Sequence, residues 1–206
     1  APAELPAAAA FMDANPNSGL LVLRGETILA ERYNYDRKPE MRFQSFSMTK
    51  TVVALLVGVA LAESKISTID DRAEKYVPAL RGHPYGETSL RHLLTMSSGV
   101  TFSERYDGRD DVAALIGKAL LGQGPGGADT VASFTRRERP AGTRFHYSSG
   151  ETQVLGLVLR AATGRNLSEY LAEKIWQPMG AEAEATWQVD AGGYETGFMG
   201  INATVR

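Results

Sequence analysis

Apolar residues stand in short blocks between polar stretches along the first part of the chain. One of these blocks, Leu20 to Leu23, fits a buried strand and is followed by the turn-forming pair Gly25-Glu26. Thr27 to Tyr33 would continue as a second strand, so we expect a β-hairpin here. Before it, Ala7 to Asp13 predicts a short helix, which the breakers Asn15-Pro16 end.

The longest apolar block follows a polar loop and extends from Thr51 to Ala62. It has no polar face, and a helix that is apolar all round is typical of a domain core. We therefore expect this helix to be buried on every side. At roughly 12 residues the block is too short to span a bilayer, so we expect no membrane span.

Helical periodicity dominates the middle of the chain, from about Ile66 to Gly180. Segments with an apolar stripe, bounded by caps, glycine or proline, predict helices here. They are Thr88 to Met96, Asp110 to Leu121, Glu151 to Thr163 and Leu167 to Trp176. Beyond them, Thr186 to Val189 predicts the start of a strand.

These elements predict an α+β fold, in which an antiparallel sheet is flanked by helices and joined to a mostly helical region. Residues 1–65 would form the N-terminal part of the α/β domain, with the hairpin and the apolar helix. Residues 66–180 would form the helical region, and residues 181–206 would return toward an incomplete sheet. A hairpin alone cannot cover an apolar helix, because small sheets usually need at least about three strands. We therefore expect a C-terminal remainder of the same protein to supply further strands.

Composition narrows the classes of function. Of the 206 residues, 43% are hydrophobic and 22% are charged, which is ordinary for a soluble globular protein. A net charge of -2 gives no reason to expect nucleic acid or an anionic membrane as a partner. The sequence has no cysteine, which excludes disulfides, thiolate metal sites and a cysteine nucleophile. No two histidines stand at ligand spacing on one element, so we expect no metal and no other cofactor.

The sequence leaves the compartment open. No stretch has the basic start and apolar centre of a signal peptide. Ala1 to Pro6 fits a mature end left by cleavage, which favours a periplasmic or secreted protein. The same residues fit an internal start, which a cytoplasmic protein would also allow.

The tetrad Ser47-Met48-Thr49-Lys50, directly before the apolar block, carries the main chemical signal. Serine becomes a nucleophile when a base takes its proton, and lysine can be that base in its neutral form, which burial favours. Residues three apart on a helix share a face, so Ser47 and Lys50 can meet. The free N–H groups at a helix N-terminus also favour developing negative charge. The pattern indicates an activated serine, although a serine before an apolar block is often only a helix cap.

A Ser-His-Asp hydrolase is the rival interpretation. It needs a histidine base, and no G-x-S-x-G turn precedes a helix in this sequence. His92 lies on a short amphipathic segment and is interpreted as structural. His146 neighbours Tyr147 and is a candidate for lining the site.

Further motifs follow the serine tetrad in a definite order. They are His92 to Gly99 (HLLTMSSG), Phe145 to Gly150 (FHYSSG), Leu155 to Val158, Thr163-Gly164 and Gln177 to Gly180 (QPMG). With this ordered set the chain resembles the serine β-lactamase and penicillin-binding protein superfamily. Within it, the resemblance is to the class C-like branch, with family VIII esterases and 6-aminohexanoate-dimer hydrolases. It extends from Leu20 to Arg206 and implies a β-lactamase/DD-peptidase-like fold.

The resemblance implies roles for particular residues. Ser47 would be the acylated nucleophile, Lys50 its proton acceptor or electrostatic partner, and Tyr147 the relay that passes protons to and from the leaving group. Ser149 stands where the family's Tyr-x-Asn element has asparagine, so it would orient Lys50 or the substrate differently. Tyr106 would cover the substrate from its loop, as a tyrosine does in the nylon-oligomer branch.

We interpret the chain as a serine hydrolase that acts through an acyl-enzyme on a small ester or amide. A β-lactamase or DD-peptidase is the alternative, and a penicillin-binding sensor that is acylated without turnover is the alternative from another class. The family's third element, Lys-Thr-Gly or His/Trp-x-Gly on a late strand, has no match here. Gly192-Gly193 reads as a loop and is not assigned to it.

Overall fold

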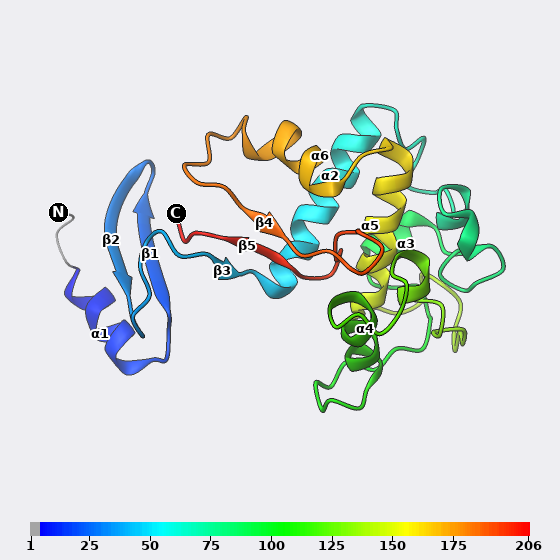
Figure 1. Cartoon of the computed structure of the whole chain (residues 1–206), viewed down its shortest axis with the longest axis horizontal. Coiled ribbons are helices and arrows are strands. Elements are labelled where there is room, and N and C mark those ends of the chain that lie inside the picture. Colours follow the sequence, from blue (N-terminus) through cyan, green and yellow to red (C-terminus); the bar gives the residue numbers. More distant parts are fainter. Residues whose placement is uncertain (1–4) are drawn as a thin grey trace. The chain divides into compact units, whose positions relative to one another are not determined.

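The structure is a computed structural model that describes residues 5–206. The expectation about the first six residues therefore lies mostly outside the described part. The chain forms two compact units (Figure 1). The first unit contains Ala1–Gln44, Ala181–Ala185 and Asn202–Arg206, and the second contains Ser45–Gly180 and Thr186–Ile201.

The first unit is built around the predicted hairpin, which the structure confirms. Strands β1 (Gly19–Arg24) and β2 (Thr27–Tyr33) pair antiparallel, with Gly19 opposite Tyr33. Helix α1 (Pro6–Ala14) precedes them, as expected. The short strand β3 (Phe43–Gln44) pairs antiparallel with the last two residues of β5 (Ile201–Ala203).

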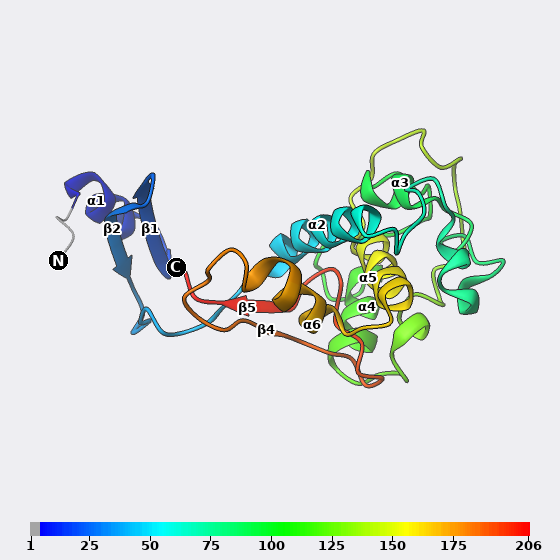
Figure 2. The same cartoon turned by 90° about the horizontal axis from the view of Figure 1, so that it is seen from above.

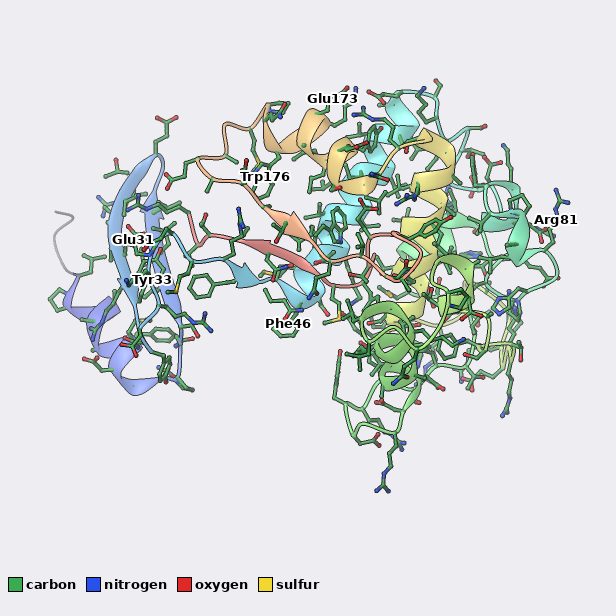
Figure 3. The ribbon with its side chains drawn as sticks, in the orientation of Figure 1. Glu31, Tyr33, Phe46, Arg81, Glu173 and Trp176 are labelled. Carbon is green, nitrogen blue, oxygen red and sulfur yellow. The ribbon has the colours of Figure 1, made fainter. Side chains whose placement is uncertain are left out.

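The carboxylate of Glu31 on β2 joins two other residues of this unit, Tyr33 and Arg206. Tyr33 donates its hydroxyl to Glu31 over 2.7 Å, and Figure 3 shows the two side chains close together on the strand. Arg206 forms an ion pair with the same carboxylate. Burial and the bond to Glu31 raise the pKa of Tyr33 to about 12.

Helices α2 (Thr49–Ala62) and α5 (Ser149–Thr163) form the centre of the second unit and lie side by side in Figures 1 and 2. The buried face of α2 carries Val53, Leu56, Val57 and Ala60, and α5 contributes a nearly continuous buried stretch. The expectation that the apolar helix is buried on every side is wrong. Leu55 is 54% exposed, and Thr51, Ala54 and Gly58 on the same side are exposed too. An apolar sequence permits burial all round, but the described neighbours of α2 leave one face uncovered.

The other predicted helices are present with shorter bounds. Ser89 caps α3 (Leu90–Leu94) and Asp110 caps α4 (Asp111–Leu120) through their side chains. Helix α6 (Leu167–Leu171) continues into the π-helical turn η5 (Ala172–Trp176). This unit also contains η1 (Phe46–Met48), η2 (Ala73–Lys75), η3 (Pro78–Leu80), η4 (Gly127–Thr130) and β4 (Thr186–Trp187). None of the helices in the described residues is long and apolar enough to cross a membrane.

A glycine contact brings the segment after Thr196 against α5. A Cβ added at Gly197 would lie 2.5 Å from the carbonyl oxygen of Thr152, which is closer than atoms can approach. The Gly197 N–H donates to Oε1 of Gln153 over 2.8 Å. The absence of a side chain at position 197 therefore allows the segment that carries the Phe198 carbonyl to pack directly against α5.

Candidate active site

Ser47 and Lys50 meet at the start of α2. Ser47 lies in the 3-10 turn η1 (Phe46–Met48) and is exposed, whereas Lys50 lies in the first turn of α2 and is only 9% exposed. The Lys50 Nζ donates to Ser47 Oγ over 3.0 Å and to the carbonyl oxygen of Phe198 over 2.9 Å. The amine thus contacts the hydroxyl that it would have to deprotonate, while a fixed carbonyl holds it in place.

Tyr147 also lies close to the Lys50 amine, together with the Ser47 hydroxyl and the Phe198 carbonyl. It lies one residue before Ser148, the N-cap of α5, and the centre of its ring lies 5.0 Å from Lys50 Nζ. Its side chain is 38% exposed, and its hydroxyl forms no hydrogen bond within the part of the chain that the structure describes. The hydroxyl is therefore available to a substrate.

Hydrogen bonds from Ser45 and Thr49 to neighbouring residues hold the turn that carries Ser47. Thr49 is fully buried, and its Oγ1 lies 2.8 Å from Ser45 Oγ and accepts the Ile201 N–H over 3.3 Å. The Ser45 N–H donates to the Ile201 carbonyl over 2.8 Å. Phe46 has a φ of 44°, a left-handed conformation that is costly for a residue with a side chain and that clusters at functional sites. These bonds hold Ser47 on a strained turn.

Two cavities open on either side of Ser47. The cavity that we call the Phe198 cavity has a volume of about 250 Å³. Its lining residues are Phe46, Ser47, Tyr106, Val112, Ile116, Ser149, Phe198 and Met199. The cavity that we call the Tyr147 cavity has a volume of about 340 Å³. Its lining residues are Ser47, Lys50, Thr51, Ala54, Leu93, Leu94, Met96, Tyr147, Thr152 and Leu155. An acyl group and its leaving group can therefore lie on opposite sides of the serine.

The structure places Tyr106 on the wall of the Phe198 cavity, in a tightly held loop. Its φ is 58°, and its backbone N–H donates to Asp110 Oδ2 over 2.6 Å. Its hydroxyl donates to Glu104 Oε1 over 2.5 Å. Desolvation of the hydroxyl, followed by this bond, raises the pKa of Tyr106 above its ordinary value.

Ser149 also lines the Phe198 cavity, but its hydroxyl is turned away from Lys50. The side chain is 1% exposed, and Oγ donates to Glu104 Oε1 over 2.8 Å. The Ser149 N–H donates to the other oxygen of Glu104, also over 2.8 Å. Glu104 thus engages the Ser149 hydroxyl. An asparagine side chain at this position would instead be able to bond to Lys50 or to a substrate.

His146 is not brought to Ser47. Its Nε2 lies 2.7 Å from the carbonyl oxygen of Phe102, and its N–H donates to the Met96 carbonyl over 2.7 Å. It lines neither of the two cavities beside Ser47. In this structure His146 ties the Tyr147 segment to the loop that follows α3.

A buried carboxylate lies just beyond this segment, on the first turn of α5. Glu151 is 2% exposed, and its Oε1 accepts the N–H of Ser98 over 3.2 Å and its hydroxyl over 2.7 Å. Its Oε2 is buried without a partner. Burial raises the pKa of Glu151 to about 7, against the bonds from Ser98 and the charge of Arg137. Glu151 therefore carries a proton over much of the pH range below neutrality.

Sequence reasoning missed Glu104 and Phe198. Glu104 reaches Ser149 across 45 positions of the chain, and no local pattern announces such a pair. Phe198 contributes a backbone carbonyl, which every residue type has. Among the described residues, no group of three or more histidine, aspartate or glutamate side chains is arranged to hold a metal ion.

Comparison with known families gives one match, to the family described as Beta-lactamase, over residues 7–198. The chain belongs to the beta-lactamase family. The match includes Ser47, Lys50, Tyr147 and the segment that carries Phe198. The family assignment agrees with the resemblance inferred from the ordered motifs.

Individual beta-lactamase family members agree with this assignment. The chain is 31% identical over 190 residues to the 6-aminohexanoate-dimer hydrolase of Paenarthrobacter ureafaciens, covering 90% of this chain and 48% of that protein. It is 27% identical over 141 residues to a beta-lactamase of Pseudomonas fluorescens, covering 67% of this chain and 35% of that protein. The chain thus spans about half or less of the length of these curated relatives, which are hydrolases.

Solved structures of the beta-lactamase family share the fold. A Bacillus anthracis protein with the provisional name 6-aminohexanoate-dimer hydrolase superposes with a TM-score of 0.83 at 22% identity, covering 96% of this chain and 53% of that one. A class C beta-lactamase of Rhodobacter sphaeroides gives a TM-score of 0.66 at 18% identity, covering 98% of this chain and 61% of that one. At these identities the likeness shows the fold alone, and it confirms the α+β prediction.

Proposed function

We propose that this chain carries the nucleophile and proton-transfer groups of a serine hydrolase that acts through an acyl-enzyme on small esters or amides. Membership of the beta-lactamase family supports the reaction class. The observation that carries the proposal is the hydrogen bond of 3.0 Å between the buried Lys50 amine and the exposed Ser47 hydroxyl. An exposed nucleophile with its base in contact is the arrangement that acyl transfer needs.

The chemistry proceeds in two halves. Neutral Lys50 takes the proton from Ser47 Oγ, which attacks the substrate carbonyl and forms a tetrahedral adduct. Tyr147 donates its hydroxyl proton to the leaving oxygen or nitrogen as that bond breaks, and it recovers a proton from the Lys50 ammonium beside it. Water then attacks the ester on Ser47 by the reverse route and releases the acid. The free N–H groups at the start of α2 favour the negative charge of both adducts.

Covalent labelling tests the nucleophile. A fluorophosphonate probe should label the wild-type protein at Ser47, and Ser47→Ala should remove both labelling and p-nitrophenyl acetate hydrolysis by several orders of magnitude. Ser133→Ala is the matched control, because Ser133 is exposed and lines neither cavity beside Ser47. Near-normal turnover in a Ser47→Ala sample with unchanged circular dichroism would refute the proposal.

A substrate panel separates the candidate activities. The Pseudomonas fluorescens relative makes a beta-lactamase the second candidate. Ser149 favours esters and amides, because its hydroxyl is engaged by Glu104 and no asparagine amide is offered to a β-lactam. We expect turnover of p-nitrophenyl acetate or 6-aminohexanoate dimer to exceed that of nitrocefin and of a D-Ala-D-Ala peptide. Labelling by penicillin without release of product would instead identify a sensor.

A further inference from the structure

The Phe198 cavity has an apolar floor and a small polar wall. Phe46, Val112, Ile116, Phe198 and Met199 supply the apolar surface. The polar wall consists of the hydroxyls of Tyr106 and Ser149, next to that of Ser47. No described residue that lines this cavity carries a charge on its own side chain.

The polarity of this wall is set by Glu104, which lies directly behind it. One carboxylate accepts the Tyr106 hydroxyl over 2.5 Å, the Ser149 hydroxyl over 2.8 Å and the Ser149 N–H over 2.8 Å. All three partners donate, which fits an ionised carboxylate, because such a group only accepts. Since both hydroxyl protons point to Glu104, the oxygens of Tyr106 and Ser149 can offer only lone pairs to the cavity.

No described cation forms an ion pair with this carboxylate. Lys50 lines the other cavity, and its Nζ lies 5.8 Å from the centre of the Phe198 ring, but a substitution at Glu104 leaves the Lys50 charge unchanged. Arg105, next to Glu104 in sequence, is largely exposed and pairs with Asp107 over 3.2 Å. Asp110 and Asp111, which also accept hydrogen bonds from this loop, add negative charge.

We propose that Glu104 is a specificity-determining residue that makes the Phe198 cavity select substrates by charge. The cavity would favour an acyl or leaving group that carries a cation at the end of an apolar chain over a neutral group of equal shape. The apolar floor accepts the chain, and the lone pairs backed by the carboxylate attract the cation. This inference rests on the proposed function, because the charge preference is measured as a difference in the rate of hydrolysis at Ser47.

The test compares two esters that differ only in charge. One is the p-nitrophenyl ester of butanoate with a terminal trimethylammonium group, and the other has the isosteric tert-butyl group. For the wild-type protein we expect kcat/KM to be roughly tenfold higher for the cationic ester, about 1.4 kcal/mol, and the ratio to fall as salt rises. In Glu104→Gln, which keeps the shape and the acceptor for the two hydroxyls but loses the acceptor for the Ser149 N–H, the ratio should fall toward one.

Two further variants separate charge from folding. Glu104→Asp keeps the charge and should retain most of the preference even if it lowers the rate for both esters. Glu173→Gln is the matched control for loss of a carboxylate. Glu173 lies on η5 and pairs with Lys174 and with Arg165, and Figure 3 shows it on the opposite side of the second unit from Phe46. Its ratio should equal that of the wild type.

The possible results distinguish the role of Glu104 from the proposed hydrolase function. A ratio that is the same in the wild type and in an active Glu104→Gln overturns the assignment of Glu104. Hydrolysis of neither ester by the wild type contradicts the proposed function instead. The charge preference is then measured from the Kd values of the two matching N-methylamides, and equal values for the cationic and neutral amides would overturn it.

Discussion

The buried carboxylate of Glu151 should make the stability of this protein depend on pH near neutrality. Glu151→Gln replaces it with a neutral group of the same shape, which can still accept the two hydrogen bonds from Ser98. Because Oε2 is buried without a partner, ionisation of Glu151 in the folded state leaves a charge with little compensation. The substitution removes the proton equilibrium and leaves the surrounding packing in place.

The magnitude follows from the pKa of Glu151, which burial raises from its ordinary 4.5 to about 7. The folded state then binds more protons than the unfolded state between these values, so stability falls as pH rises through them. The contribution is fully present below pH 4.5 and lost above about pH 7. At about 1.4 kcal/mol for each pH unit, the loss amounts to about 3 kcal/mol.

Urea unfolding, followed by tryptophan fluorescence at several pH values, measures this difference. The free energy of unfolding of the wild type, relative to Glu151→Gln, should fall by about 3 kcal/mol from mildly acidic to mildly alkaline pH. Glu195→Gln is the control: burial raises the pKa of Glu195, but the bonds from Ser168 outweigh it and lower the pKa. Stability gained from a lowered pKa is lost only in acid, and Glu195→Gln still contains Glu151. The free energy of unfolding of the wild type, relative to Glu195→Gln, should therefore show no trend near neutrality. A wild type that runs parallel to Glu151→Gln would refute a raised pKa.

Three further substitutions test the site and its support. Lys50→Arg should lower kcat nearly as much as Lys50→Ala, because arginine keeps the charge but does not release its proton; substantial activity in Lys50→Arg would exclude a proton-acceptor role. Tyr147→Phe should lower kcat by roughly 100-fold, as for loss of a general acid, and a loss below about threefold would leave Tyr147 a structural role. Gly197→Ala should destabilise the fold by about 1 to 3 kcal/mol in urea unfolding, since its Cβ would meet the Thr152 carbonyl; an unchanged midpoint would contradict that close approach.

Local patterns predicted the elements of this fold well. The hairpin was predicted because the turn-forming pair Gly25-Glu26 follows the apolar block Leu20 to Leu23. Helix α4 was predicted because Asp110 precedes a helical stripe. The exposure of Leu55 could not be predicted, because apolar periodicity describes the helix and says nothing of its neighbours. The shortening of the predicted helix at Thr88 to Leu90–Leu94 reflects the cap at Ser89.

The site was predictable where chemistry depends on sequence spacing and not where it depends on long-range contacts. Ser47 and Lys50 are neighbours on one helical turn, so their hydrogen bond follows from their spacing. The partner of Ser149 could not be inferred, because Glu104 lies on a loop whose path is set by Asp110. The position of His146 was open for the same reason: its ring contacts a carbonyl on that loop.

The bond from Lys50 to the Phe198 carbonyl joins positions 148 residues apart. A second bond, from the Ile201 N–H to Thr49, spans 152 residues at the same place. Contacts between distant positions form late in folding, because a large loop has to close before they can stabilise anything. During synthesis, Ser47 and Lys50 leave the ribosome long before the segment that fixes the amine. The nascent chain thus lacks the bond that holds the Lys50 amine, and this bond forms only when the segment with Phe198 packs against α5.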